Sequence, residues 1–308
     1  MKHIFIINPV AGKGNEWRRI LDAINSAVSA GTDCEIYETT APHDATRFVR
    51  ERIKNKPDGE IYRFYACGGD GTLSEVVSGA ALQKDVEVGC IPIGTGNDFV
   101  RNFTEIKAFF DVQKQLDGTA LPIDCYRFGD DEYGVNMINI GFDCDVAAKA
   151  SELKRNSFIP KALAYIAGVM VLLKENKGCT IRLIREDGSE RTGEFQLVSA
   201  ANGGFCGGGF HSAPKSSLSD GMLDISLISK VTRTELFRLI GAYKAGKHLG
   251  TKLGKRVVEY NYAKKIEFVF TEPTNVCIDG EIIKMNSISL EIVPKAISFV
   301  IPVGSKVK

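Results

Sequence analysis

A glycine-rich segment at residues 68–72, Gly-Gly-Asp-Gly-Thr, constrains the fold of this chain more than any other stretch. It follows a run of β-branched and aromatic residues at 61–65, and it precedes apolar residues at helical spacing over 72–80. The glycines therefore lie at a turn from a strand into a helix, where backbone amides and the helix N-terminus can bind a polyphosphate. Asp70 is placed to hold the accompanying magnesium. The alternative is an ordinary turn in which Asp70 caps the helix.

A second turn of the same kind follows one strand later. Residues 86–91 read as a strand, and residues 92–99 continue as Pro-Ile-Gly-Thr-Gly-Asn-Asp-Phe, with Asp98 as a second aspartate. Two earlier turns, at residues 8–14 and 39–44, also come directly after predicted strands. This repeated strand, turn and helix pattern predicts a Rossmann-like, doubly wound, mostly parallel α/β sheet. All four turns should then lie at the carboxyl ends of the strands, where such sheets bind ligands. Helical spacing returns once more over residues 106–116.

The pattern changes after residue 121. Short alternating or β-branched segments punctuated by Gly and Asp predict a second domain, an antiparallel β-sandwich over residues 122–294. The predicted strands are residues 122–127, 133–140, 179–184, 194–200, 222–228, 265–270, 275–278 and 287–293, and the predicted helical segments are 146–153, 161–174 and 234–248. The first domain is expected over residues 1–121.

Composition excludes several classes of protein. The chain has 308 residues, a hydrophobic fraction of 44% and a net charge of +1, which gives no overall sign of nucleic-acid binding. The 8 cysteines form no C-x-x-C pair and have no clustered histidines, so they read as reduced structural thiols, as in a cytoplasmic protein. The longest apolar run, residues 162–173, is shorter than the ~18 residues that span a bilayer. We therefore expect no transmembrane segment.

The paired motifs GGDGT and IPIGTGNDF resemble the catalytic domain of the diacylglycerol kinase family, which includes bacterial lipid kinases and sphingosine and ceramide kinases. The resemblance covers nearly the whole chain. It implies an NAD kinase/diacylglycerol kinase-like fold in which residues 295–308 return to the first domain, and ATP as phosphoryl donor with Mg²⁺ as cofactor. NAD kinases share the first motif but differ in the second.

The resemblance also implies a set of nucleotide-binding residues. Residues 8–14 resemble the family's NPxxGxG segment but lack the spacing of a P-loop, so Lys13 is not expected to act as a P-loop lysine. His43 stands where the family commonly has glycine, and Asp44 could equally be a helix cap. The implied residues are Asn8, Pro9, Gly12, Thr39, Gly68, Gly69, Asp70, Gly71, Thr72, Glu75, Gly94, Thr95 and Asn97.

Two magnesium roles follow from the same resemblance. A structural ion would be held by the Asp220 side chain and the carbonyls of Ser217 and Met222; the alternative is a plain Asp-Gly turn. Met222 could contribute only its backbone, because a thioether is a poor ligand for a hard ion. Asp70 and Asp98, with Asp124, would organise the catalytic magnesium and its water.

Two further segments of the second domain matter. Residues 277–281, Cys-Ile-Asp-Gly-Glu, match the family's DGE motif, in which the glutamate is the general base, so the resemblance makes Glu281 catalytic together with Asp70 and Asp98. From the residues alone, Asp279 and Glu281 share a face unless Gly280 bends the chain into a hairpin with a solvated glutamate. Residues 202–210 resemble the family's glycine-rich segment, except that Cys206 replaces a common aromatic residue; flexible surface glycines are the alternative.

These observations lead to one functional expectation, an ATP-dependent lipid kinase that phosphorylates diacylglycerol to phosphatidic acid in phospholipid metabolism. Another lipid hydroxyl, on a sphingoid base or phosphatidylglycerol, stays open, as do an NAD kinase and a nucleotide-binding regulator without catalysis. The expected partner is a lipid at the membrane surface, visited by a cytoplasmic enzyme. A homodimer is left open.

Overall fold

The computed structural model describes residues 1–12, 16–142, 144–148 and 178–308, which form two compact units. The first unit comprises Met1–Asn136, Ser217–Gly221 and Ile292–Lys308, and the second comprises Met137–Ser216 and Met222–Glu291. The first unit thus runs past residue 121, where the sequence pattern placed the boundary. Its extension has a structural cause, because β5 (Thr119–Arg127) pairs with β15 (Glu281–Ile301) and with β6 (Tyr133–Gly134).

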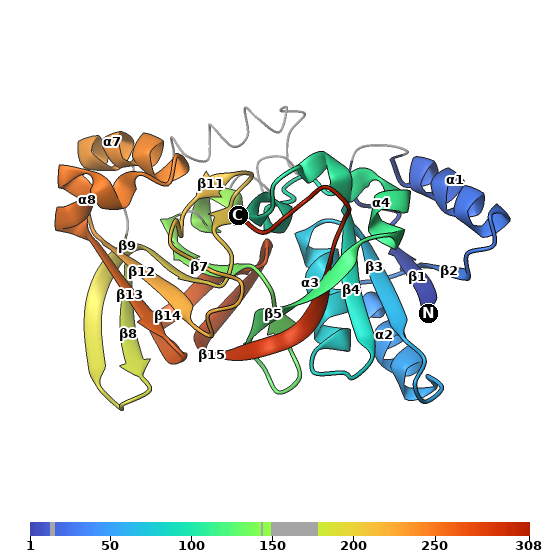
Figure 1. Cartoon of the computed structure of the whole chain (residues 1–308). Coiled ribbons are helices and arrows are strands. Elements are labelled where there is room, and N and C mark those ends of the chain that lie inside the picture. Colours follow the sequence, from blue (N-terminus) through green and yellow to red (C-terminus); the bar gives the residue numbers. More distant parts are fainter. Residues whose placement is uncertain (13–15, 143, 149–177) are drawn as a thin grey trace. The chain divides into compact units, whose positions relative to one another are not determined.

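The first unit is built on a parallel sheet in the order β2-β1-β3-β4-β15 (Figure 1). Its first four strands are β1 (Lys2–Ile7), β2 (Cys34–Glu38), β3 (Tyr62–Gly68) and β4 (Val86–Pro92). The last strand enters late in the chain, where Ser298 and Phe299 of β15 pair in parallel with Glu87 and Val88. The central strands are almost wholly buried, as expected for parallel strands covered on both faces.

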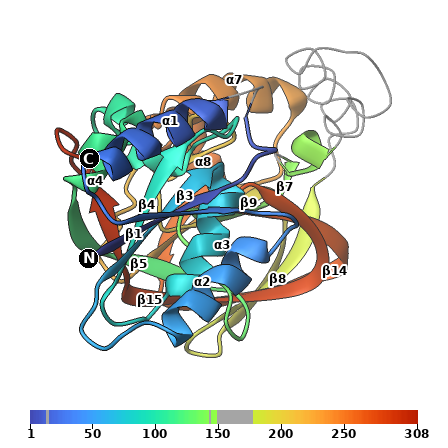
Figure 2. The ribbon, with the colours of Figure 1, turned by 90° about the vertical axis from the view of Figure 1, so that its right-hand side faces the viewer.

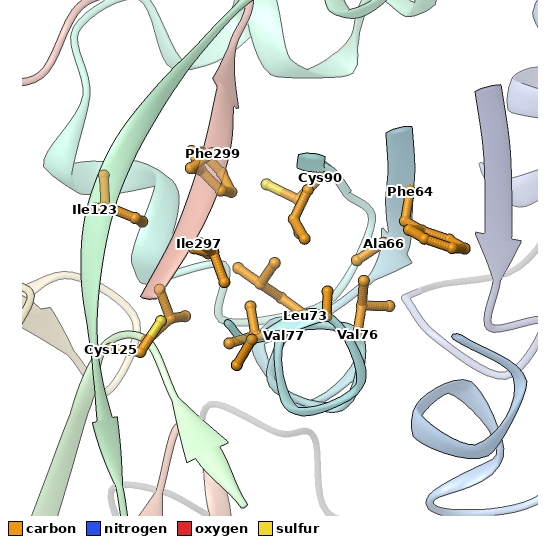
Figure 3. Packing of buried hydrophobic residues seen from close by; sticks show 14 of the residues in the cluster. Phe64, Ala66, Leu73, Val76, Val77, Cys90, Ile123, Cys125, Ile297 and Phe299 are labelled. Atoms are coloured by element: carbon orange, nitrogen blue, oxygen red, sulfur yellow. The ribbon is translucent and has the colours of Figure 1, made fainter. Parts of the chain in front are cut away.

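Helices cover both faces of this sheet, which makes it doubly wound (Figure 2). Phe5 and Ile7 pack in one core with α1, while Ile4 and Ile6 pack on the opposite face with α2 and α3. The helices are α1 (Glu16–Ser29), α2 (Asp44–Lys54) and α3 (Asp70–Ala80). Figure 3 shows Leu73 and Val77 of α3 directed toward the sheet and toward Ile297 of β15. The late strand is therefore part of the core that supports α3.

Residues 106–116, over which helical spacing returns in the sequence, form two short helices. That segment forms a 3-10 helix, η2 (Ile106–Phe110), and a short helix, α4 (Val112–Leu116). Asp111 separates them because its backbone is extended (φ −97°, ψ 112°) and its carboxylate accepts a hydrogen bond from the Lys114 amide at the start of α4. A second 3-10 helix, η1 (Phe99–Asn102), follows the second glycine turn.

The second unit is antiparallel throughout its main sheet. Its strands follow the path β13-β12-β9-β7-β14-β15, and β8 pairs with both β9 and β14. The predicted strands 265–270 and 275–278 form one strand with a register shift between Val269 and Thr274. The strands are β7 (Met137–Gly141), β8 (Cys179–Arg185), β9 (Glu190–Ala201), β12 (Leu223–Ser229), β13 (Val258–Ala263) and β14 (Lys265–Ile278).

Several smaller elements complete the second unit. The ribbon of β10 (Phe205–Cys206) and β11 (Phe210–His211) stands apart from the main sheet. Of the predicted helical segments, residues 161–174 and most of 146–153 lie outside the described residues, and residues 234–248 correspond to α7 (Arg233–Lys244) and η3 (His248–Gly250). Helix α8 (Lys252–Val257) and strand β13 were not predicted. Among the described residues, no helix is both long and apolar enough to span a membrane.

Candidate active site

The four predicted turns of the first unit lie at neighbouring strand ends. The Thr39 amide donates to the Ile7 carbonyl (2.9 Å), and the Asn8 amide donates to the Cys67 carbonyl (2.9 Å). The Gly94 amide completes the series by donating to the Gly68 carbonyl (3.0 Å). The backbone of each turn is thus bonded to the end of the next strand, so all four turns share the carboxyl edge of the sheet.

Two glycines of this edge are required by close packing. A Cβ on Gly94 would lie 2.3 Å from the Gly69 Cα, and a Cβ on Gly68 would lie 2.2 Å from Thr72 Oγ1. Such distances are far below any real contact, so a larger residue at position 94 would push the two glycine turns apart, and one at position 68 would displace Thr72. A small hollow of ≈ 200 Å³ lies beside them, lined by Gly68, Gly69, Asp70, Leu73, Cys90, Pro92, Asn97, Phe99 and Val100.

Asp70 connects the first glycine turn to the second. It is the first residue of α3, and its two carboxylate oxygens accept hydrogen bonds from the backbone amides of Asp98 and Phe99, each at 3.1 Å. The helix-cap alternative is not observed, because the N-cap residue is Gly69 and it makes no side-chain cap hydrogen bond. Asp70 therefore orients the loop that carries Asp98.

The carboxylates of Asp70 and Asp98 converge beside Gly96. A Cβ on Gly96 would lie 3.1 Å from Asp70 Oδ2 and 3.6 Å from Asp98 Oδ2. Two convergent carboxylates are the oxygen donors that Mg²⁺ prefers, so this pair fits a magnesium-nucleotide. No cluster of three or more His, Cys, Asp or Glu side chains that could hold a metal occurs in the part of the chain that the structure describes. A metal here would therefore need water or phosphate oxygens to complete its shell.

Asn97 shapes the second turn. Its backbone is left-handed (φ 51°), and its side-chain amide donates to the carbonyls of Pro92 (2.7 Å) and Gly94 (2.9 Å). Its Oδ1 is buried and accepts no hydrogen bond from any described residue. A buried acceptor without a donor at this position fits a ligand or water that donates to it. Thr95, in the same loop, is exposed.

Asn8 connects the turn at residues 8–14 to the turn at residues 68–72. Its Nδ2 lies 3.1 Å from Thr72 Oγ1, while its Oδ1 accepts a hydrogen bond from the Val10 amide. Pro9 follows Asn8 directly, and Gly12 has a positive φ (77°) that suits glycine. Lys13 lies outside the described residues. Thr39 Oγ1 is directed at the Ile7 carbonyl (3.4 Å), so its hydroxyl has a protein acceptor within this edge.

Glu75 connects α3 to the start of α2. Its carboxylate accepts the backbone amides of His43 (3.0 Å) and Ala45 (3.1 Å), which lie at the N-terminus of α2. His43 has φ 64°, a left-handed conformation that glycine adopts without strain. Asp44 accepts hydrogen bonds from Thr40 and Tyr37 and pairs with Arg47, and these contacts, chiefly the Thr40 amide, lower its pKa to about 2. Gly71 lies in the first turn of α3.

Asp124 holds a turn of the first unit in place. Its buried carboxylate accepts the backbone amides of Gly221 (2.7 Å) and Lys295 (2.8 Å), and its own amide donates to the Leu218 carbonyl (2.7 Å). These contacts show a structural use for Asp124. The turn, Ser217–Gly221, ends with Gly221 at φ 70°, and Asp220 within it is exposed. The structural magnesium site predicted at Asp220, Ser217 and Met222 stays a prediction.

Asp279 and Glu281 do not share a face. Asp279 (φ 43°) and Gly280 (φ 94°) are the central residues of a two-residue hairpin turn in which Ile278 pairs with Glu281. Positive φ at both positions is what a type I′ turn requires. Asp279 is buried and its Oδ1 accepts the Met137 amide (2.9 Å), whereas Glu281 is exposed. The geometry gives the two carboxylates different environments and makes Asp279 a structural residue.

An apolar pocket of ≈ 1030 Å³ occupies the second unit, and no sequence motif signalled it. Leu236, Leu239 and Tyr243 of α7 form one wall, opposite strand residues that include Leu197 and Ile228. Its remaining lining residues are Asn139, Phe142, Cys144, Val146, Ala147, Gln196, Cys206, Gly207, Phe210, Ile240 and Cys277. They come from many separate elements, which explains why the pocket could not be predicted from contiguous residues.

Two polar residues were also missed. Asn139 lines the apolar pocket, and its buried Oδ1 accepts no hydrogen bond from the described residues. Arg101 lies beside the second turn, donating to Asp98 Oδ1 (3.2 Å) and to the Gly96 carbonyl (3.3 Å). The one feature of the sequence that could have indicated this contact is the spacing of three residues between Asp98 and Arg101. Arg101 places a cation next to the convergent carboxylates.

The glycine-rich segment near Cys206 is an ordered hairpin. Phe205 pairs with His211 and Cys206 pairs with Phe210, and the three intervening glycines all have positive φ, between 58° and 108°. The turn therefore requires glycine at these positions because of the positive φ angles, and the alternative of flexible surface glycines does not describe this hairpin. Cys206 is buried, where it lines the apolar pocket.

Comparison with known proteins agrees with this architecture. Residues 2–128 match the family model described as "Diacylglycerol kinase catalytic domain", and residues 136–301 match "YegS C-terminal NAD kinase beta sandwich-like domain". A diacylglycerol kinase of Bacillus subtilis is 29% identical over 285 residues, covering 90% of this chain and 88% of the relative. A diacylglycerol kinase of Staphylococcus carnosus is 29% identical over 280 residues, covering 90% and 87%.

The fold is shared with a solved structure. A crystal structure of a diacylglycerol kinase from Bacillus anthracis superposes with a TM-score of 0.68 at 22% identity, covering 98% of this chain and 97% of that chain. The chain belongs to the diacylglycerol kinase family of lipid kinases. Its second unit accordingly corresponds to the family's β-sandwich domain.

Proposed function

We propose that this protein transfers the γ-phosphoryl group of ATP to the hydroxyl of diacylglycerol, giving phosphatidic acid. The observation that carries the proposal is the joining of two glycine turns through Asp70, whose carboxylate converges with that of Asp98 beside Gly96. Phosphoryl transfer depends mainly on positioning and charge neutralisation, and this edge supplies backbone amides, two carboxylates and Arg101.

Each group has a role in this proposal. Magnesium, when bound, would neutralise the developing charge on the phosphates, with Asp70 and Asp98 as its protein ligands. Asn97 and Thr95 would contact the nucleotide from the turn at residues 94–98. Asn8 and Thr72 would contact it from the turns at residues 8–14 and 68–72. Glu281 would accept the proton of the acceptor hydroxyl. Glu75 and Asp124 would act by holding the backbone of these segments.

The apolar pocket supports a lipid acceptor. Ligand pockets are typically apolar with few polar groups, and here the lining combines aliphatic and aromatic side chains with Asn139. We propose that the pocket receives the acyl part of the lipid. A water-soluble acceptor would gain few hydrogen bonds from such an apolar lining.

A radiolabelled ATP assay over a panel of neutral lipids in mixed micelles tests the proposal. Label should enter the organic phase with diacylglycerol, and Asp70→Asn should reduce the rate at least about 10²-fold while circular dichroism stays unchanged. Label in a water-soluble product instead, or full activity of Asp70→Asn, would refute it. Label in another lipid would replace diacylglycerol by that acceptor.

A further inference from the structure

The segment from Arg233 to Arg256, which contains α7, η3 and α8, has a charge unlike that of the rest of the chain. It carries seven Lys or Arg residues against one acidic residue, Glu235, whereas the whole chain has a net charge of +1. All seven cationic side chains are exposed. They are Arg233, Arg238, Lys244, Lys247, Lys252, Lys255 and Arg256.

The single acidic residue of this segment, Glu235, binds groups within the segment and next to it. Glu235 forms a capping box with Thr232 at the N-terminus of α7, and its carboxylate also pairs with Arg256 of α8. These hydrogen bonds, led by that of the Thr232 amide, lower the pKa of Glu235 to about 2. The pairing links α7 to α8, which lie next to each other in Figure 1. Arg238 of α7 and Lys252 and Arg256 of α8 therefore lie together on one surface.

The outward surface also carries an aromatic side chain. Phe237 is 74% exposed, more than any other aromatic residue among those described. Leu236, Leu239 and Tyr243 of the same helix are buried against the apolar pocket, so the helix is already anchored by its inner face. Phe237 adds nothing to that packing. Exposed aromatic residues within a basic helical surface are typical of proteins that lie on membranes.

A surface hollow between the two helices adds a site for an anion. It has a volume of ≈ 770 Å³ and is lined by Arg238, Lys252 and Arg256, together with Glu235, Leu239, Thr251 and Leu253. Arg256 pairs with Glu235 in this lining, so Arg238 and Lys252 leave the hollow with a net positive charge that suits the phosphate of a phospholipid headgroup.

We propose that the outer surface of α7 and α8 docks the protein on the anionic phospholipids of a bilayer. The cations attract the anionic headgroups, the hollow takes one phosphate, and Phe237 enters the interfacial region. On the other side of α7 lies the apolar pocket, so docking would bring the pocket wall to the lipid surface. This inference rests on the proposed function in that a lipid kinase must collect its acceptor from a membrane.

Vesicle sedimentation tests the surface directly. We expect the full chain to bind vesicles of phosphatidylcholine with phosphatidylglycerol, to bind phosphatidylcholine alone poorly, and to release from the anionic vesicles at high salt. The triple variant Arg238→Gln/Lys252→Gln/Lys255→Gln should lose at least about tenfold in vesicle affinity. Lys54, Lys84 and Lys107 are exposed lysines of the first unit, and their replacement by Gln is the charge-matched control. Phe237→Ser should weaken the binding that remains at high salt.

The outcomes separate this surface from the proposed function. If the triple variant bound anionic vesicles as tightly as the control variant, or if the protein preferred DNA or polyglutamate to these vesicles, the docking proposal would fail. Activity on lipid in neutral detergent micelles should be unchanged in the triple variant, while activity on vesicles falls. Surface-dependent vesicle binding without phosphorylation of any lipid would instead refute the proposed function and leave the surface standing.

Discussion

At the scale of single residues, the structure separates carboxylates that look alike in the sequence. Asp279 and Glu281 are two positions apart, yet one is buried on the Met137 amide and the other is exposed. Asp70 and Asp124 each accept two backbone amides, but the Asp70 carboxylate also converges with that of Asp98 beside Gly96. This convergence is what marks Asp70 and Asp98 as candidates for chemistry.

Glu281→Gln should lower turnover by about 10²–10⁴-fold, the usual contribution of a general base, while ATP affinity is nearly preserved. Steady-state kinetics with ATP titration measures both quantities. Asp279→Asn is the contrasting variant, because it weakens the hydrogen bond to the Met137 amide and should chiefly reduce stability. A fully active Glu281→Gln enzyme would sink the assignment of Glu281.

At the scale of elements, the glycine turns act as spacers. Gly94 lets the second turn approach Gly69, and Gly68 makes room for Thr72, so the two turns can share the hydrogen bonds of Asp70. Glu75 of α3 also accepts hydrogen bonds from the backbone amides of His43 and Ala45 at the start of α2. The geometry of this edge therefore depends on contacts between turns as much as on each turn.

Gly94→Ala should therefore destabilise the first unit by about 1–3 kcal/mol and reduce turnover, because its Cβ meets the backbone of Gly69. Urea unfolding and the kinase assay would measure the two effects. Gly241→Ala is the control, since nothing lies within 4 Å of its Cβ position in α7 and alanine favours a helix. Equal stability of the two variants would show that the turns can separate freely.

The turn around Asp220 leads to a second prediction at this scale. If its carboxylate and the neighbouring carbonyls hold magnesium, added Mg²⁺ should raise the melting temperature, because the ion binds only the folded state. Asp220→Ala should abolish that rise, whereas Asp130→Ala, which changes another exposed loop carboxylate, should keep it. A wild-type melting temperature that is the same in EDTA and in Mg²⁺ would argue against the structural ion.

At the scale of the whole molecule, each unit buries one histidine in its neutral form. Burial, helped by Arg63 for His3 and by His211 for His248, lowers the pKa of both side chains to about 4. His3 Nδ1 is hydrogen-bonded to the Tyr65 hydroxyl, and neither ring nitrogen of His248 has a partner among the described residues. Protonation of either imidazole therefore opposes folding.

Stability should fall between pH 6.5 and pH 4, because in this range the unfolded chain binds protons that the folded histidines do not. Each histidine contributes a loss on the order of 2 kcal/mol by pH 5, at about 1.4 kcal/mol per pKa unit. Asp44 and Glu235, with pKa values of about 2, lose their stabilising ionisation only at lower pH. Urea midpoints of the wild type and His248→Phe at pH 7 and pH 5 measure the effect. An unchanged pH dependence in the variant would show that His248 is not responsible.

Much of the first unit could be predicted from the sequence by itself. The order of strands and helices and the location of the glycine turns that contain Asp70 and Asp98 are carried by contiguous residues, because strand and helix periodicity and turn composition are local properties. Family resemblance extended this to the class of enzyme.

The tertiary structure alone decided which residues meet. It bonded Glu75 to the backbone at the start of α2, joined Asp124 to Gly221 and Lys295, and assembled the apolar pocket from many separate elements. It also separated Asp279 from Glu281 through two positive φ angles. Such contacts depend on packing between segments far apart in the chain, or on a turn conformation selected by that packing, and neither leaves a periodic signal in the sequence.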